Sequence, residues 1–424
     1  MAIIDLGELR DDVTPGLPAR RRPADRRPYR FVAALVVALV TLASATPGPE
    51  RVTATAPGGT VAAPIVVDDR VYLVQPPDPE RGVGRQLIAY RMTGDGLRTL
   101  WRTLLPGGGV PVGGIERAGR LLVYGRSADE ARWESMAVEL RTGRVGWQLP
   151  GVVVAAGDAV LLHTVASEGA DEVRRVDVAT GRTLWTVAAP ADVVNWSVGP
   201  AGVERLVLVP AIGPVAVHDA VSGVRLVARD LHPGELPARR RILVAAGLLL
   251  EVSDAGASVA AYDLDTLERR WTASLPLVGF VQRCGRLLCA ARQAGGMWAL
   301  DPGTGRIAWT NPRWQAVLAA SGGRLLVTGM GTTAPEHTVV EVATGRVLAE
   351  LGDWGTIPLD ASGALVVGVR RAADGRLLVA ELDPAADRAR VRDAVPGATG
   401  DCRASVTVLV CRRSDGAFGV WRIG

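Results

Sequence analysis

The sequence predicts an all-β fold: a β-propeller of eight to nine four-stranded blades, closed by an N-terminal strand and preceded by one N-terminal hydrophobic helix. The first observation is a repeated turn unit, present in residues 176–187 (VDVATGRTLWTV) and again in residues 299–310 (ALDPGTGRIAWT). The second is the pattern after residue 56, where short apolar and polar runs alternate between turn residues and no convincing amphipathic helix occurs.

Each turn unit has the form acid-x-x-Thr-Gly-x-x-x-Trp. The acid can accept hydrogen bonds from backbone amides of its own turn, and the glycine can take the positive φ that closes the turn. The tryptophan covers roughly 200 Å² of apolar area, and we expect it to fasten an outer strand to its neighbours. The strong copies are residues 139–147, 177–185, 263–271 and 301–309, and a looser copy precedes them. The predicted structural docking residues are Trp101, Trp147, Trp185, Trp271 and Trp309.

Weaker copies of the unit have Val227, Ala349 or Val391 in place of the tryptophan. The docking positions are then about 41 residues apart, a period typical of propellers, and each unit has room for four short strands. Candidate strands give nine units, but the first and last units are degenerate, so eight blades is the alternative. The last unit ends at Gly424, before its outer strand, while residues 51–55 form a candidate strand ahead of the first unit. We expect this N-terminal strand to complete the last blade and remove the exposed sheet edges.

The N-terminus combines an arginine-rich tail with an apolar run. Between Arg20 and Arg30 lie six arginines and the single acid Asp25, directly before the uncharged residues 31–45. This order predicts that the tail, residues 1–30, stays cytoplasmic. Residues 31–47 are near the lower length limit for a spanning helix, and we predict that they form a transmembrane signal-anchor.

A cleaved signal peptide is the alternative interpretation of the apolar run. Ala43-Ser44-Ala45 matches an A-x-A cleavage site, and cleavage after Ala45 would release a secreted protein. We favour the anchor because the leader is long and partly acidic. Both interpretations export residues 48–56, the predicted linker and closing strand, and residues 57–424, the predicted propeller.

The four cysteines all lie on the predicted exported side, which favours disulfides. Of the three pairings, we predict Cys284 with Cys289 and Cys402 with Cys411, because each of these pairs lies within one candidate hairpin. Free buried thiols are the alternative.

The repeated turn units resemble the tryptophan-docking repeats of the PQQ-like (quinoprotein alcohol dehydrogenase-like) β-propeller superfamily. The resemblance covers most of residues 56–424, although the copy at residues 263–271 has Leu267 where the others have glycine. It implies the propeller fold, whereas the superfamily includes quinone-dependent dehydrogenases, outer-membrane assembly scaffolds and other exported proteins. Function therefore has to come from the site.

The quinone-dependent dehydrogenases of that superfamily imply a specific set of residues. They hold pyrroloquinoline quinone beside a disulfide of adjacent cysteines, with Ca²⁺ on acidic and amide ligands and an aspartate base. This chain has no Cys-Cys pair, and Asp177, Asp263 and Asp301 are accounted for by their turns. We therefore predict a protein without catalysis, cofactor or metal site.

Charge and residue usage argue against other functions as well. The four histidines are scattered without the spacing of a zinc site, and the absence of lysine excludes a Walker or Schiff-base lysine. The formal net charge of +4 is small for 424 residues, so no nucleic-acid partner is predicted.

Three tryptophans outside the docking positions lie where an outer strand joins the next inner strand: Trp196, Trp314 and Trp354. They form a candidate binding face, and packing between blades is the alternative. We predict an exported, membrane-tethered propeller that binds an envelope or membrane protein as a scaffold. A PQQ-dependent oxidoreductase and a cell-wall glycan or small-ligand sensor are the alternatives.

Overall fold

The computed structural model describes residues 53–423, apart from gaps at 58–62, 81, 107–108, 158, 165–170, 190–192, 200–201, 211, 234–240, 254–256, 332–333 and 358–365. The predicted hydrophobic helix, residues 31–47, lies outside the described residues. Among the residues that are described, no helix is long and apolar enough to cross a membrane. All strands belong to one compact unit, Val52–Gly424.

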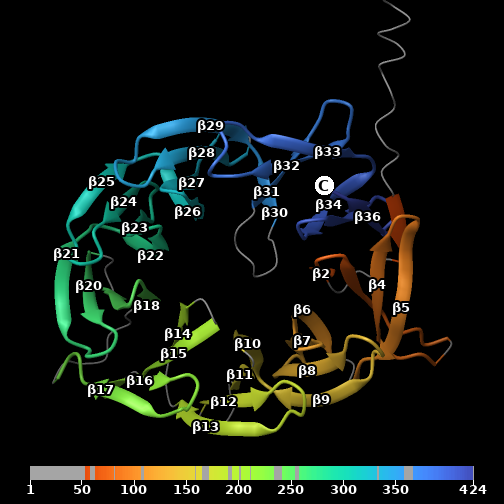
Figure 1. Cartoon of the computed structure of the whole chain (residues 1–424), viewed down its shortest axis with the longest axis horizontal. Coiled ribbons are helices and arrows are strands. Elements are labelled where there is room, and N and C mark those ends of the chain that lie inside the picture. The colour runs from red at the N-terminus through yellow and green to blue at the C-terminus, as the bar shows by residue number, and fades with distance from the viewer. Residues whose placement is uncertain are drawn as a thin grey trace, which may run out of the picture. The chain divides into compact units, whose positions relative to one another are not determined.

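The strands form nine antiparallel sheets of four strands each, which we number as blades 1 to 9 (Figure 1). Blades 1 to 3 contain β2 (Ile65–Val67), β3 (Arg70–Gln75), β4 (Gln86–Thr93), β5 (Gly96–Leu104); β6 (Val110–Arg117), β7 (Arg120–Arg126), β8 (Trp133–Glu139), β9 (Val145–Pro150); β10 (Val152–Ala156), β11 (Ala159–Thr164), β12 (Asp171–Asp177) and β13 (Thr183–Ala189). Blades 4 to 6 contain β14 (Val193–Gly199), β15 (Gly202–Val209), β16 (Val215–Asp219), β17 (Arg225–Arg229); β18 (Arg241–Ala245), β19 (Leu248–Val252), β20 (Ser258–Asp263), β21 (Arg269–Ser274); β22 (Val278–Cys284), β23 (Leu287–Arg292), β24 (Met297–Leu300) and β25 (Ile307–Asn311). Blades 7 to 9 contain β26 (Trp314–Ser321), β27 (Arg324–Gly329), β28 (Glu336–Glu341), β29 (Val347–Asp353); β30 (Gly355–Ile357), β31 (Val366–Arg371), β32 (Leu377–Leu382), β33 (Arg390–Val395); β34 (Ala398–Ala404), β35 (Val408–Arg413), β36 (Phe418–Arg422) and β1 (Thr53–Ala56).

Blade 9 is assembled from both ends of the propeller. Its strand order is β1-β36-β35-β34, and β1 pairs antiparallel with β36 from Thr53 opposite Trp421 to Ala56 opposite Phe418. The predicted N-terminal strand closure is therefore confirmed. The count is nine blades, because the degenerate first and last units both form complete sheets.

Each blade is a meander, so its connections divide between two faces of the ring. We call its strands A to D from the inside outwards. A–B and C–D connections lie on one face, the turn face, and B–C and D–A connections lie on the other, the loop face. The described connections of the turn face are mostly short hairpins, such as Ala118-Gly119 between β6 and β7. The loop-face connections range from the single Gly151 to residues 230–240.

The acidic turns have the geometry that the repeat predicts. Asp177 accepts hydrogen bonds from the Thr180 backbone N–H at 2.8 Å and from its hydroxyl at 2.6 Å. Gly181 has a φ of +73° and donates its N–H to the Asp177 carbonyl at 2.9 Å. The residue in the left-handed region makes a bulge that ends the hairpin with the right twist for the outer strand.

The hydrophobic core consists of nine buried clusters, one at each joint between neighbouring blades. Each sheet thus packs its faces against the two neighbouring sheets, and the described residues form no single central core. This arrangement explains how a chain of this length folds as one ring.

The predicted docking tryptophans lie on outer strands and reach to the turn of the following blade. Trp147 on β9 donates its indole N–H to the Val178 carbonyl in the next blade at 2.9 Å, and Trp309 on β25 does the same to Val342. Equivalent bonds join Trp101 to Leu140, Trp185 to Val221 and Trp271 to Pro302. Four of these rings are buried and Trp185 is half-buried.

The turn glycine has a second role that the sequence did not reveal. A Cβ built at Gly143 would lie 2.8 Å from the ring of Trp101, and one at Gly181 would lie 2.6 Å from the ring of Trp147. The docked ring therefore packs on the bare Cα of the next turn, so glycine is required for contact as well as for φ.

Leu267 is the exception among these turns, and its partner position is also exceptional. Leu267 has a φ of +54° and is 1% exposed, and the preceding blade carries Val227 instead of a tryptophan. Both side chains belong to the cluster between blades 4 and 5. The leucine side chain occupies space that a docked indole fills elsewhere.

Candidate binding face

The loop face is the part of the ring where the blades differ most from one another. Its connections vary in length and composition, whereas several C–D connections of the turn face repeat the same acid–Thr–Gly turn. Repeated surface serves the fold, and variable loops on a rigid scaffold are the usual place for recognition. Residues that recognise a partner are therefore expected on the loop face.

Two of the three tryptophans predicted for the binding face are buried. Trp314 is 3% exposed and packs edge-on against Trp309, with ring centroids 5.7 Å apart. Trp354 is 2% exposed, donates its indole N–H to the Leu351 carbonyl at 2.8 Å and carries the Arg370 guanidinium over its ring. Both rings fill joints between blades, so the packing alternative describes them. The prediction that they form an open face does not fit their burial.

Trp196 is the member of the predicted set that stays partly exposed. It lies on inner strand β14 and meets the ring of His163 from β11 edge-on, with centroids 6.3 Å apart. His163 Nε2 lies 3.7 Å from an Asp171 carboxylate oxygen. Burial lowers the pKa of His163, although Asp171 opposes this effect. These residues place an aromatic ring, an imidazole and a carboxylate together between blades 3 and 4.

A second histidine–carboxylate pair lies on blade 5. His232, in the connection that follows β17, holds the Glu251 carboxylate through Nε2 at 2.8 Å, and the Tyr262 hydroxyl donates to the same oxygen at 3.2 Å. Glu251 is buried, whereas the His232 side chain is 30% exposed. The buried carboxylate fixes the orientation of an imidazole at the loop face.

Trp133 is a candidate that the sequence interpretation missed. It starts β8, opposite Arg126 at the end of β7, and the Arg126 guanidinium lies 4.4 Å from the centroid of its ring. The ring is partly exposed and the arginine is exposed. The strand register after the turn signal of residues 127–132 could have identified this pair, because the two positions face each other across a B–C hairpin.

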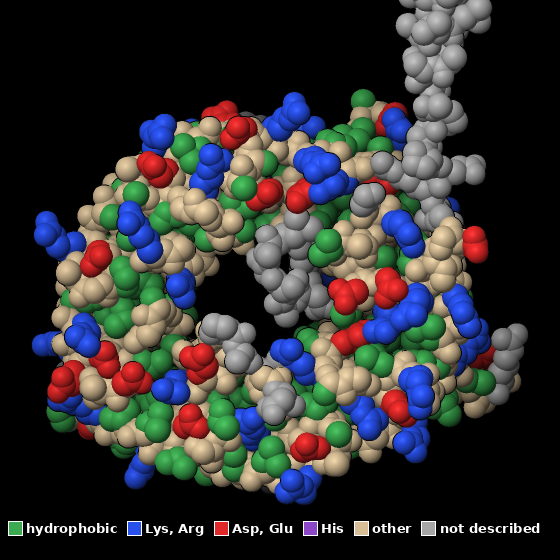
Figure 2. Space-filling model, in the orientation of Figure 1, with side chains coloured by type: hydrophobic (Ala, Val, Ile, Leu, Met, Phe, Trp, Pro, Cys, Tyr) green, Lys and Arg blue, Asp and Glu red, His purple; other side chains and the backbone are tan. Residues whose placement is uncertain are grey.

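We define the loop-face sector as Arg126, Trp133, His163, Trp196 and His232, on blades 2 to 5. Tryptophan and arginine are enriched among the residues that dominate binding energy at protein interfaces, and the two imidazoles add hydrogen-bonding groups beside them. Figure 2 shows acidic and basic side chains interspersed around one face of the ring, and the described residues there form no extended area of one sign.

The described residues do not fit a quinone and calcium site. They contain no group of three His, Cys, Asp or Glu residues that could hold a metal ion. The acids at the repeated turns are engaged locally, as Asp301 is with both the N–H and the hydroxyl of Thr304. The disulfides join cysteines within hairpins rather than adjacent cysteines. No mechanism through such a cofactor is proposed.

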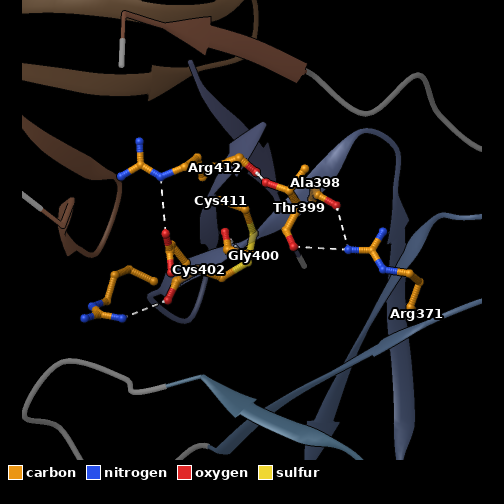
Figure 3. The surroundings of a disulfide bond; sticks show 9 residues. Arg371, Ala398, Thr399, Gly400, Cys402, Cys411 and Arg412 are labelled. Carbon is orange, nitrogen blue, oxygen red and sulfur yellow. Dashed lines mark hydrogen bonds and ion pairs between the residues drawn. A yellow bond between two sulfur atoms is a disulfide. The ribbon is translucent and has the colours of Figure 1, made fainter. Parts of the chain in front are cut away.

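The cysteines form the two disulfides that were predicted from their positions within hairpins. Cys284 is bonded to Cys289 in blade 6, and Cys402 to Cys411 in blade 9 (Figure 3). Cys284, Cys289 and Cys411 are at most 1% exposed, and Cys402 is 9% exposed.

One family model matches part of this chain, and several solved structures resemble it. Residues 169–312 match the family model described as outer membrane protein assembly factor BamB. No curated protein sequence matches the chain. Similar solved structures include BamB from Moraxella catarrhalis (13% identity, 87% of this chain, 96% of that chain, TM-score 0.45) and the computationally designed Ika8 protein (16% identity, 74% and 96%, TM-score 0.48). Another is a europium-containing methanol dehydrogenase (11% identity, 77% and 83%, TM-score 0.41).

These structural similarities are too distant to carry an argument about function. The family match covers four consecutive turn units, one of which has Val227 in place of the tryptophan, and agrees with the resemblance inferred from their residues. The described residues thus form a β-propeller of nine four-stranded blades with tryptophans docked on the following turns, and residues 169–312 match a PQQ-like repeat family.

Proposed function

We propose that the protein is an exported, membrane-tethered scaffold that binds an envelope or membrane protein and catalyses no reaction. The loop-face sector is the observation that carries this proposal, because it gathers partly exposed aromatic, arginine and histidine side chains on adjacent blades. The family model that matches residues 169–312 describes an assembly factor, which supports a role in holding another protein.

The geometry of the sector suits a protein partner. The Trp133 ring offers apolar area that is rigid because Arg126 covers one side of it, so little conformational entropy is lost on binding. His232 is oriented by buried Glu251 and can hydrogen-bond a partner's backbone or carboxylate. Such preorganised anchors, separated by loops, give affinity without a deep cavity.

Tethering is proposed from the sequence. The arginine-rich residues 1–30 and the apolar residues 31–47 favour a signal-anchor, which leaves the propeller outside the cytoplasm. Two disulfides are compatible with an oxidising compartment. Tags before residue 10 and at Gly424 should both travel with the membrane fraction, and only the C-terminal tag should be open to external protease. Mature protein that begins at Thr46 and is soluble would contradict the anchor.

A sensor of glycans or other small ligands is the second candidate function. Trp196, His163 and Asp171 favour it, because a ring beside a carboxylate and an imidazole can stack on a sugar and bind its hydroxyl groups.

Crosslinking from intact envelopes tests the proposal. The full chain and the double variant Arg126→Ala/Trp133→Ala should be crosslinked and compared by mass spectrometry. The matched control is Ile307→Ala, since Ile307 is a 50% exposed apolar side chain on an outer strand away from the loop face. We expect the double variant to recover the partner at least about tenfold less well, as for an interface hot spot, and the control to match the wild type.

Two different outcomes of this crosslinking experiment would contradict the proposal. Equal loss in the double variant and the control would contradict the loop-face sector as the docking site. Recovery of cell-wall glycan that depends on Trp196, with no crosslinked protein, would favour the sensor.

A further inference from the structure

The two disulfides occupy different kinds of joint. Cys284 and Cys289 lie in the cluster between blades 6 and 7, which also holds docked Trp309 and Trp314. Cys402 and Cys411 lie in the cluster between blades 8 and 9, where the outer strand of blade 8 carries the exposed Val391 instead of a docking tryptophan. The first disulfide adds to an existing fastening, whereas the second takes the place of one.

Apart from the disulfide, the strands of blade 9 are held together weakly at two places. Its inner strand β34 departs from regular pairing with β35 between Gly400 and Arg403, and Cys402 lies within this irregular stretch. Its outer strand β1 is four residues long and belongs to the opposite end of the propeller sequence. The disulfide is therefore the covalent link that keeps β34 and β35 in register at the place where their hydrogen bonds are interrupted.

Polar contacts on either side of blade 9 depend on that register. Arg371 of blade 8 donates to the Ala398 and Thr399 carbonyls at 3.2 Å each, next to the disulfide (Figure 3). On the other side, the Ser405 hydroxyl donates to the Asp68 carbonyl of blade 1 at 2.5 Å. The carbonyl groups that accept from Arg371 belong to β34, and Ser405 lies in the hairpin between β34 and β35. A shift of β34 would weaken both joints of the blade.

We propose that the Cys402–Cys411 disulfide is a redox lock on ring closure. In the oxidised protein it fixes β34 against β35 and completes the joint between blades 8 and 9. On reduction, β34 loosens, both joints of blade 9 weaken, and β1 separates from β36, while blades 1 to 8 keep their structure. This device is independent of the partner that the loop face binds.

The redox step is an exchange with a dithiol. The thiolate of a dithiol reductant attacks Sγ of Cys402, the more exposed of the two sulfurs, and Cys411 leaves as a thiolate. The second thiol of the reductant then resolves the mixed disulfide, so two electrons and two protons move to the cysteine pair and the reductant becomes a disulfide. Arg412, bonded to Asp401 at 3.2 Å, and Arg403, which donates to the Cys402 carbonyl, flank this disulfide in the sequence.

Hydrogen exchange on the full chain tests the lock. The double variant Cys402→Ala/Cys411→Ala is compared with the matched control Cys284→Ala/Cys289→Ala, which removes the other hairpin disulfide. We expect amides of β1, β34 and β36 to exchange at least about tenfold faster in the first variant, with blades 2 to 5 unchanged. The control should leave β1 at the wild-type rate.

Titration of the wild-type chain with a dithiol provides a second measurement that does not depend on either variant folding. Alkylation should label Cys402 and Cys411 at lower reductant concentration than Cys284 and Cys289, and the exchange of β1 should rise with that first labelling. The lock is overturned if β1 exchange is unaffected by the loss of Cys402–Cys411, if both double variants release β1 equally, or if the whole ring unfolds together.

Discussion

The joints between early and middle blades differ from the joints that close the ring. Five joints are fastened by an outer-strand indole that packs on the glycine of the next turn and donates to a carbonyl there, as Trp271 does at Gly305 and Pro302. The joints on either side of blade 9 have no such ring on their outer strands. They rely on Cys402–Cys411, on Arg371 and on the strand β1.

The difference follows from what a repeat can encode. A docking pair needs a tryptophan in one unit and a Thr–Gly turn in the next, and both are supplied when identical units follow one another. At the closure, the third strand of blade 9 is β36 and its fourth strand is β1, so no C–D turn joins them to receive a ring. The closing joints are therefore built from contacts that the repeat does not contain.

The largest expected effect is the loss of a docked ring. Trp309→Ala removes an 8% exposed indole and its bond to Val342, and should destabilise the protein by ~3–5 kcal/mol through the cavity that remains. Val391→Ala, at the equivalent outer-strand position of blade 8, should cost less than ~1 kcal/mol because Val391 is 52% exposed. Denaturant unfolding of both variants measures the contrast. Similar losses would show that the outer-strand position matters whether or not a ring is docked there.

The next effect separates the two roles of the turn glycine. Gly143 and Gly119 both have a φ of +74°, but a Cβ at Gly143 would lie 2.8 Å from the Trp101 ring, whereas one at Gly119 meets nothing within 4 Å. Gly119→Ala should cost ~1 kcal/mol from backbone strain alone, and Gly143→Ala a further ~1–3 kcal/mol from displacing the ring. Equal melting temperatures of the two variants would mean that only φ selects glycine.

A smaller effect should appear when a docking joint is introduced between blades 4 and 5. Val227→Trp alone should clash with Leu267, and Leu267→Gly alone should leave a cavity, so both single variants lose stability. The double variant should recover at least ~1 kcal/mol relative to the sum of the two losses. Strict additivity in a double-mutant cycle would argue against the pairing of these two positions.

Much of the fold could be predicted from the sequence, whereas part of the candidate site could not. The period of about 41 residues, the turn acids and the closing strand follow from local patterns, so the nine-bladed fold was predicted within one blade. The burial of Trp314 and Trp354 could not be predicted from the sequence. Neither tryptophan is part of a periodic pattern, and such a pattern is what distinguishes a buried position from an exposed one. Trp133 was missed although the strand register across the turn at residues 127–132 places it opposite Arg126. The coupling of Val227 to Leu267 depends on contacts between consecutive units, which no single unit contains.

The smallest effect concerns acid. Burial lowers the pKa values of His163 and His337. Just below the pKa of the unfolded chain, these two histidines are therefore protonated in the unfolded chain but still neutral in the folded protein. Their contribution to stability is present above the unfolded pKa of about 6.5 and is lost as pH falls through the lower folded values. His337→Gln should reduce this acid sensitivity in thermal melts between pH 7 and 5. Since the sequence has no histidine after residue 337, exchange in blade 9 should change little over that range.

Native-state hydrogen exchange of the unmodified, oxidised chain tests most directly whether the two kinds of joint differ. Outer strands that carry a docked ring, such as β9 and β25, should protect their amides more strongly than β33 and β1, which carry none. We predict that exchange in β33 and β1 is about tenfold faster or more. Equal protection across all nine outer strands, or the strongest protection at β1, would contradict the account of ring docking and ring closure given above.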